Sequence, residues 1–257
     1  MKTCIAILFL LLGGICCAQG AADGAPPYQA AYPESDAAAA WRALAASYVR
    51  KALKDRTLDA DRTLNARVDA VMATVGAAVA AIDARFADSS WRAILIHDFG
   101  YGAAAFPGET ILVDAKFVRT LQLNDDELAL ILSHEAAHVI AGHASVKLSF
   151  MSAVLGKERL PNARSALLEF LAKDDYAAAY RPTAQLQERE ADALGAAIFF
   201  AAGYAPQRAL GVFDKLATLE SREGQAADAH DAAAVRKRAV SAVIAELQGF
   251  RPGRDSN

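Results

Sequence analysis

Apolar residues recur at helical spacing between Leu64 and Phe86. They follow one another at intervals of three and four residues, which places them on one side of a helix of about six turns. A continuous apolar stripe of this kind is typical of a helix that packs against a core, and we predict such a helix here. Another helix is predicted just upstream, with Ser35 as its N-cap, continuing through Trp41 to Leu53.

The pattern then changes to short extended segments. Residues 91–98 are typical of a β-strand, and they are followed by a glycine-containing turn and a second extended piece that runs through Ala105. Residues 110–113 predict a third strand. His97 lies in the first of these strands, and we expect a structural role for it.

A long apolar segment after the strands predicts a further helix. Its start has the features of a capping box, with Asn124 as N-cap and Glu127 three residues later. The acidic residues at positions 125 and 126 suit the positive end of the helix dipole. Gly142 is expected to end this helix, because glycine is common just past the last helical turn.

The C-terminal half of the chain predicts more helices. Pro182 is expected to open one of them and Gly203 to close it. Residues 165–172 predict a short amphipathic helix, which we interpret as part of a surface hairpin in preference to a lid. Two helices are predicted after these, over residues 206–220 and 232–247.

His134, Glu135 and His138 form an H-E-x-x-H motif inside the helix that begins at Asn124. Each helical residue advances by about 100°, so the two histidines lie about 40° apart, one turn above the other, and can bind one metal ion. Glu135 can reach a water on that ion without being a ligand, which is the position of the general base in zinc proteases. The alternative is a half-buried helix whose histidines bond to nearby polar groups.

A catalytic zinc site needs a third protein ligand and leaves its fourth position to water. Glu188 and Asp192 follow about fifty residues downstream and, being four residues apart, share one helix face. Glu188 can bind the metal, while Asp192 can accept a hydrogen bond from the free ring nitrogen of a ligand histidine. The alternative for this pair is a solvated charged face. His143 would point about 140° away from His138 on a continuous helix, so it is not a further ligand in that geometry.

Three segments together carry a family resemblance: HEAAH at 134–138, EREAD at 188–192, and AFPG at 105–108 just before the third predicted strand. With them the chain resembles the zinc metallopeptidase family M48, which includes HtpX-like membrane proteases, CAAX prenyl proteases and periplasmic BepA-like proteases. The resemblance extends from about residue 60 to about residue 245. It is greatest to the BepA-like proteases, without their repeat domain.

The resemblance implies an α+β fold that is predominantly helical. The expected domain is a zincin of the gluzincin type, with a small three-stranded sheet beside the active-site helix. It also implies one Zn²⁺ per chain bound by His134, His138 and Glu188, catalysis of peptide-bond hydrolysis through Glu135, and Asp192 as a residue that supports a ligand histidine.

Some positions depart from the family pattern. The family has a histidine-proline segment with an arginine six residues after the histidine, where this chain has His230, Asp231 and Arg236. The resemblance implies that His230 approaches the metal and can contact the reacting carbonyl, with Arg236 supporting the site. Gly102 stands where relatives have asparagine, and Glu109 where they have a second glycine. These departures bear on activity rather than on zinc binding.

Residues 1–20 predict an exported protein. A lysine, a short apolar core and small residues follow one another, which is typical of a signal peptide and too short for a membrane-spanning helix. Cys16 and Cys17 raise the alternative of a lipoprotein, although the residues before them fit such a signal poorly. Residues 21–34 are rich in proline, glycine and alanine and predict a linker, which leaves residues 35–250 as a single metallopeptidase domain with N-terminal helices.

Composition narrows the classes of partner. The 27 basic and 30 acidic residues give a net charge of −3, so no basic surface for nucleic acid is expected. A hydrophobic fraction of 54%, much of it alanine, favours a helix-rich body. The apolar run 148–155 is too short to cross a bilayer, and we expect no transmembrane helix in the mature chain, leaving peripheral or lipid-anchored membrane association open.

We therefore predict a zinc-dependent endopeptidase in the periplasm, free or attached to the outer membrane. Its expected substrates are polypeptides, namely extended or misfolded proteins of the cell envelope. One alternative is a non-catalytic periplasmic chaperone or binding module that keeps zinc as a structural staple. That alternative explains Gly102 and Asp231 but gives no reason for Glu135. Another is a structural envelope protein in which the motif is a coincidence.

Overall fold

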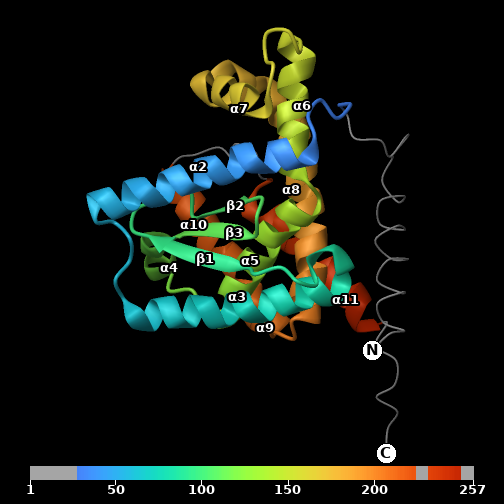
Figure 1. Cartoon of the computed structure of the whole chain (residues 1–257). Helices are drawn as coiled ribbons and strands as arrows, with labels where there is room; N and C mark the ends of the chain where they lie inside the picture. Colours follow the sequence, from blue (N-terminus) through green and yellow to red (C-terminus); the bar gives the residue numbers. More distant parts are fainter. Residues whose placement is uncertain (1–27, 224–230, 250–257) are drawn as a thin grey trace, which may run out of the picture.

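The computed structural model describes residues 28–223 and 231–249, and within them the protein is mostly helical with one small sheet (Figure 1). The predicted signal peptide, the three cysteines and His230 lie outside the described residues. The fold class predicted from the sequence is confirmed. The elements are α2 (Glu34–Asp55), α3 (Arg62–Ile82), the 3₁₀ turn η1 (Ala84–Phe86), β1 (Arg92–Ile96), β2 (Ala103–Phe106), β3 (Thr110–Asp114), α4 (Ala115–Thr120), α5 (Asp125–Ile140), α6 (His143–Leu155), α7 (Ala163–Ala172), α8 (Asp174–Ala201), α9 (Pro206–Ala209), α10 (Gly211–Glu223) and α11 (Ala233–Gly249).

The sheet lies between α2 on one face and α3 on the other (Figure 1). Its strand order is β1-β3-β2, with β1 parallel and β2 antiparallel to β3. Successive side chains of a strand point to opposite faces, so Ile111 and Val113 pack with the α3 and α5 core while Leu112 packs with α2. The central strand is therefore buried on both faces, and β2 is left at one edge of the sheet, beside α5.

Helix α3 begins where its sequence provides a cap. The side chain of Asp61 accepts hydrogen bonds from the backbone of Thr63 and Leu64, and the predicted apolar stripe is buried as far as Ile82. Phe86, the last residue of the predicted stripe, lies instead in η1. By length and composition alone α3 is apolar enough to cross a membrane, as are α5 and α6 together if their 49° bend is taken as one broken span. Here α3 packs its stripe against α5 and β1, as a core helix does.

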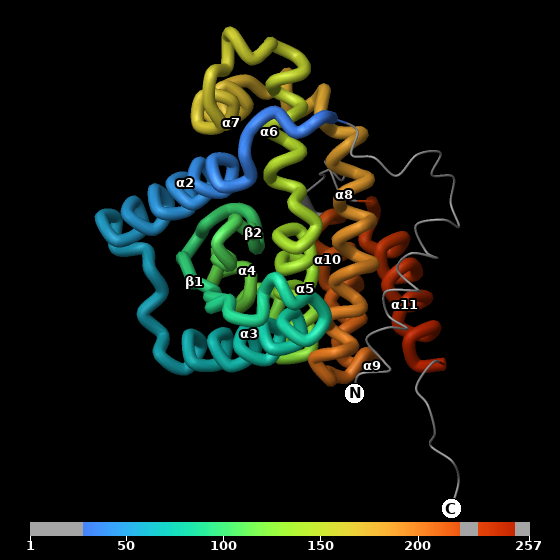
Figure 2. The backbone as a smooth tube through the Cα atoms, turned by 45° about the vertical axis from the view of Figure 1, so that its right-hand side comes forward, coloured from blue at the N-terminus to red at the C-terminus, as the bar shows by residue number. Residues whose placement is uncertain are grey.

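Helix α5 has the capping box that its sequence predicted. Asn124 Oδ1 accepts a hydrogen bond from the backbone N–H of Glu127 at 3.0 Å, and Glu127 Oε2 accepts one from the backbone N–H of Asn124 at 2.8 Å. Helix α8 lies along α5, between it and α11 (Figure 2). This pairing brings the H-E-x-x-H segment and the E-x-x-x-D segment side by side.

The prediction that Pro182 opens a helix was wrong, because α8 runs unbroken from Asp174 through it. A proline inside a helix removes a backbone hydrogen bond and costs about 3 kcal/mol, so tertiary contacts must hold the segment before it. Tyr180, only 2% exposed, supplies such a contact, because its ring centroid lies 5.1 Å from that of Phe150 on α6. Within α8 its hydroxyl also donates to Gln187 Oε1 at 2.8 Å, across the proline.

Residues 28–33, at the end of the predicted linker, pack on the rest of the protein. Tyr32 donates a hydrogen bond to the carbonyl of Leu160 at 2.8 Å, and the Tyr28 ring meets that of Phe150 at 5.4 Å. Two aromatic rings give this proline- and alanine-rich segment enough apolar area to dock. The helix that follows begins after Pro33, so Ser35 lies within its first turn and is not its N-cap.

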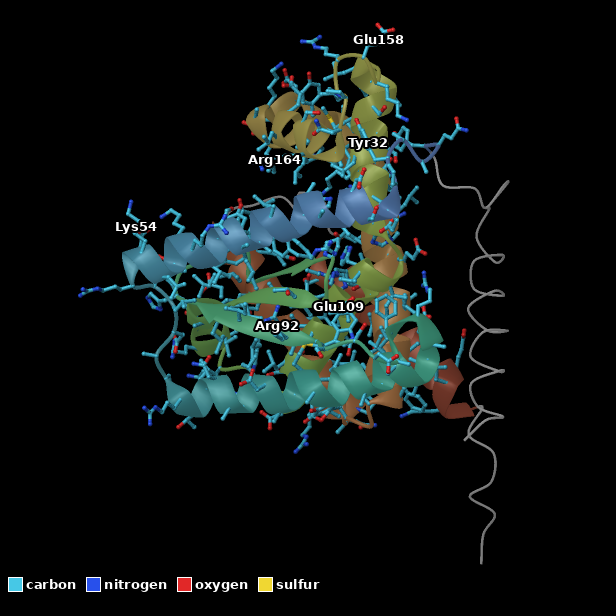
Figure 3. All side chains as sticks on the ribbon, in the orientation of Figure 1. Tyr32, Lys54, Arg92, Glu109, Glu158 and Arg164 are labelled. Carbon is cyan, nitrogen blue, oxygen red and sulfur yellow. The ribbon has the colours of Figure 1, made fainter. Side chains whose placement is uncertain are left out.

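Helices α6 and α7 form a hairpin that projects from the sheet-containing body. Glu158 and Arg164 of this hairpin lie far from Arg92 on β1 and from Glu109 in the β2–β3 turn (Figure 3). The amphipathic helix predicted at 165–172 is confirmed as α7, from Ala163. The helix predicted at 206–220 is divided at Leu210 into α9 and α10, and the last predicted helix appears as α11.

Candidate metal centre

The two motif histidines lie one turn apart on α5 and point to a common place. Their Nε2 atoms are 3.1 Å apart, and both side chains are largely buried. Glu188 reaches the same place from α8, with Oε2 3.2 Å from His134 Nε2 and Oε1 3.5 Å from His138 Nε2. The structure therefore brings together the three residues that the sequence predicted as metal ligands.

A close approach of the two helix backbones makes this convergence feasible. Gly195, two turns after Glu188 on α8, lies so near α5 that a Cβ atom on it would be 2.8 Å from His134 Cα and 2.9 Å from His134 N. Real Cβ atoms do not approach backbone this closely, so glycine is required there. The short Glu188 side chain can then span the remaining gap to the imidazoles.

The donor set and its spacing fit zinc. Two imidazoles and a carboxylate are a ligand set of catalytic zinc sites, which keep the fourth position for water. An ion held tetrahedrally at about 2.0–2.1 Å places its ligand atoms about 3.3 Å apart. The separations of 3.1, 3.2 and 3.5 Å between the Nε2 and Oε atoms match that spacing.

His134 is oriented through its other ring nitrogen. Its Nδ1 lies 3.0 Å from Asp192 Oδ1, and Arg236 donates to both oxygens of Asp192, from Nε at 2.9 Å and from Nη2 at 2.8 Å. Burial opposes ionisation of Asp192, but the hydrogen bonds from Arg236 and His134 outweigh it and hold the pKa of Asp192 well below its usual range. An ionised Asp192 accepts a hydrogen bond from the Nδ1–H group of His134, so the Nε2 lone pair of His134 faces the metal site.

In the metal-free protein these carboxylates also change the acidity of His134. Burial lowers the pKa of His134, while hydrogen bonds to Asp192 and Glu188 raise it by more, to about 9. His138 shifts the other way, because burial lowers its pKa more than Glu188 raises it. The two imidazoles therefore differ in protonation near neutral pH until a metal displaces the proton.

His138 has a comparable support that the sequence analysis missed. His143 Nδ1 lies 2.9 Å from His138 Nδ1, and His143 Nε2 lies 3.3 Å from Glu190 Oε2. When Glu190 accepts a hydrogen bond from His143 Nε2–H, the His143 Nδ1 atom carries no proton and can accept a hydrogen bond from His138 Nδ1–H. The Nε2 lone pair of His138 then faces the candidate metal site. The hydrogen bond from His143 lowers the pKa of Glu190, which favours this ionised acceptor.

The direction of His143 was derived only for a helix that continues through Gly142, which is not the geometry of the structure. In the structure α5 ends at Ile140, and Gly142 adopts a left-handed φ of 68° that starts α6 in a new direction. The turn swings the His143 ring back onto His138. Two features of the sequence could have indicated this contact: a glycine and a histidine directly after the motif, at positions 142 and 143, and Glu190 inside the EREAD segment.

Glu135 and the three candidate ligands line one large cleft of about 1320 Å³. Edge strand β2 borders the cleft through residues 103–105, and α2 borders it through Trp41. Gly102 adopts a φ of 67° just before the strand, and its carbonyl accepts a hydrogen bond from the backbone of Asp114. The cleft is thus lined by the Glu135 carboxylate, by the candidate metal ligands and by edge strand β2, which pairs with β3 alone among the described strands.

The remaining candidate residues are placed as follows. His230 lies outside the described residues, so its predicted approach to the metal stays a prediction. Asp231, which replaces the family's proline, forms a two-pronged ion pair with Arg189 at 2.8 and 3.1 Å, directly beside Glu188 on α8. Arg236 lies on α11 and clamps Asp192. His97 is exposed at the end of β1 and does not line the cleft.

Comparison with known proteins agrees with this geometry. No curated protein sequence matches the chain. The sequence model of peptidase family M48 matches residues 64–244, a span that runs from α3 to α11 and includes both helices of the candidate metal centre. That span is well over half of the 257 residues, so the chain belongs to peptidase family M48.

Proposed function

We propose that this protein is a zinc-dependent endopeptidase that cleaves extended or misfolded proteins of the cell envelope. The family is one of metallopeptidases. The observation that supports the proposal best is the meeting of His134, His138 and Glu188 within one cleft that Glu135 also lines. A purely structural metal site has no use for that extra carboxylate or for so large a cleft.

The residues of the chain divide the chemistry among themselves. A zinc ion would be held by His134, His138 and Glu188 and would supply Lewis-acid chemistry, which polarises a peptide carbonyl and lowers the pKa of a water molecule to about 7. Glu135 accepts the proton of the attacking water and later delivers it to the departing amine. Asp192, itself clamped by Arg236, keeps His134 in the tautomer that offers Nε2 to the metal.

Substrate backbone would bind along β2. The strand order leaves one edge of β2 without a strand partner among the described residues, and residues 103–105 line the cleft. An extended peptide can add to such an edge through main-chain hydrogen bonds. This mode selects unfolded polypeptide over particular side chains, which suits a role in protein quality control.

The cellular part of the proposal comes from the first 20 residues, which lie outside the described part of the chain. Their lysine, short apolar core and small residues favour export to the periplasm. Attachment to the outer membrane, through a lipid on Cys16 or Cys17 or as a peripheral contact, is part of the same proposal.

The test compares casein cleavage by wild type and Glu135→Gln, both loaded with zinc. We expect the variant to keep one zinc per chain by elemental analysis and to lose at least about 100-fold in cleavage rate. Glu158→Gln, at the far end of the α6–α7 hairpin, is the matched control and should cleave like wild type (Figure 3).

Two results would reject the proposal. Equal cleavage by wild type and Glu135→Gln would show that the activity does not use this site. Zinc binding without cleavage in either protein would favour the non-catalytic chaperone or binding module, which should then suppress aggregation of unfolded protein equally well in both.

A further inference from the structure

Lys147 is a cation on the wall of the catalytic cleft that the chemistry above does not use. It lies on α6, and its Nζ atom is 5.4 Å from the ring centroid of Trp41, 5.2 Å from that of Phe170 and 5.7 Å from that of Tyr180. These rings come from α2, α7 and α8, so four helices meet around one ammonium group. We call this arrangement the Lys147 cage.

The cage gives the ammonium aromatic faces but no hydrogen-bond acceptor. Trp41 Nε1–H donates a hydrogen bond to the carbonyl of Ala144 at 3.1 Å, and the Tyr180 hydroxyl donates one to Gln187 Oε1 at 2.8 Å. Aromatic faces attract a cation, yet an ammonium carries three N–H donors that still need acceptors. No acceptor from the described residues takes a hydrogen bond from Lys147 Nζ. Those donors are therefore available to a group in the cleft.

Three other cations on the cleft wall are already neutralised by neighbouring carboxylates, whereas Arg42, which also lines the cleft, is exposed. Each of the following lies in a salt bridge with a carboxylate: Arg85 with Asp83, Lys116 with Asp98, and Arg236 with Asp192. Lys147 makes no ion pair with any carboxylate of the described ranges. Burial lowers the pKa of Lys147, and the field of Glu188 partly offsets this, so an added negative charge beside the ammonium would be strongly favoured.

The cage is continuous with the metal centre along one face of α8. Tyr180, Ala184, Gln187 and Glu188 all line the cleft and follow the helical spacing of a single face. Glu188 lies eight helical steps after Tyr180, which corresponds to about 12 Å along the helix axis. An extended peptide covers that distance with about four residues, so one chain can reach both the metal centre and the cage.

We propose that Lys147 forms a carboxylate-binding subsite, which holds an acidic side chain or the C-terminal carboxylate of the peptide being cleaved. This inference rests on the proposed peptidase function and narrows its substrate class to peptides that carry a negative charge a few residues from the scissile bond. The aromatic cage holds the ammonium in place, and the substrate supplies the acceptor that residues 28–223 and 231–249 do not provide.

The experiment uses short fluorogenic peptides with neutral side chains. One position at a time is changed from Gln to Glu, and each peptide is made with a free and with an amidated C-terminus. We expect wild type to prefer one carboxylate by about 10-fold to 100-fold in kcat/KM, mainly through KM, which is the range of a charge-assisted hydrogen bond. A preference for Glu identifies a side-chain subsite, and one for the free terminus identifies a terminal carboxylate subsite.

Variants tie the preference to the cage. Lys147→Met should abolish it while leaving cleavage of the neutral peptide within a few-fold, and Lys147→Arg should retain it. Lys157→Met removes an exposed lysine from the same hairpin and should behave like wild type. Thermal unfolding of each variant reports whether it folds.

A binding measurement separates this inference from the proposed function. Anisotropy of the same peptides, labelled, is measured on Glu135→Gln with and without Lys147→Met. A carboxylate preference that depends on Lys147 in binding, with no cleavage by wild type, would keep the subsite and reject the peptidase. Cleavage of neutral and acidic peptides at equal rates, or an unchanged preference in Lys147→Met, would overturn the subsite and leave the peptidase standing.

Discussion

Gly195 on α8 lies against the backbone of His134 on α5, where a Cβ atom would come within 2.8 Å of His134 Cα. The position of the glutamate ligand thus depends on a residue that makes no contact with any metal. Changing Gly195 to Ala should push α8 away from α5 and separate Glu188 from the two histidines.

For Gly195→Ala we expect a loss of about 1–3 kcal/mol in the free energy of unfolding, the usual cost of overpacking, together with weaker zinc binding. Urea unfolding and competition with a zinc chelator measure the two effects. Gly249→Ala is the matched control, since its Cβ would meet nothing within 4 Å. Wild-type zinc affinity in Gly195→Ala would show that the helix contact does not position Glu188.

His143→Ala should weaken zinc binding without removing a metal ligand. The hydrogen-bonded series Glu190, His143, His138 would lose its middle member, and His138 would no longer be held in the tautomer that offers Nε2. Loss of such supporting partners typically costs 10–100-fold in metal affinity, and we expect a loss of about that size. His97→Ala, at an exposed histidine off the cleft, should bind zinc normally. Equal affinities for the two variants would limit His143 to a packing role.

How far the sequence predicted this site depends on whether local signals or tertiary contacts decide each position. Asn124 and Glu127 placed the start of α5 correctly, because a capping box acts within four residues. The histidine spacing is also local, so the convergence at His134 and His138 followed once the helix formed. Glu188 was found because its segment is rare in combination with the first motif.

The remaining features could not be predicted from the sequence, because contacts between distant segments decide them. Pro182 is a local stop signal, but burial of Tyr180 keeps α8 continuous through it. The ring of His143 returns to its neighbour only because Gly142 takes a left-handed conformation, which spacing along an ideal helix does not contain. Lys147 gave no signal in the sequence, since its three aromatic neighbours come from three other helices.

Glu109→Gly should stabilise the protein. Glu109 has a φ of 54° in the turn between β2 and β3. A left-handed conformation costs a residue with a side chain roughly 1–2 kcal/mol, while glycine costs about 0.5–1 kcal/mol in lost chain entropy on folding. The net gain should be about 0.5–1 kcal/mol, or a rise of about 1–4 °C in Tm. Glu109→Ala keeps the backbone strain and removes the carboxylate. An equal rise in Tm for Glu109→Ala would show that the gain comes from removal of the charge and would contradict the backbone explanation.

The stability of the metal-free protein should fall as pH rises from 6.5 to 9. The pKa of His134 is raised from 6.5 to about 9 in the folded protein, because its hydrogen bonds to Asp192 and Glu188 outweigh the opposing effect of burial. A raised pKa means that the folded state holds the proton more tightly than the unfolded chain does. Its contribution is therefore complete below pH 6.5 and lost as pH passes through about 9, a decrease on the order of 3 kcal/mol.

Zinc binding should show the opposite slope over the same range. The ion must displace the proton from His134, so its apparent affinity should increase by up to about tenfold per pH unit until about pH 9. Urea unfolding in EDTA and chelator competition at matched pH values give the two curves. His134→Gln should flatten the first curve, whereas His97→Gln should leave it unchanged. A metal-free wild type whose free energy of unfolding stays level or rises from pH 6.5 to 9 would mean that the imidazole between Asp192 and Glu188 is already neutral in the folded protein.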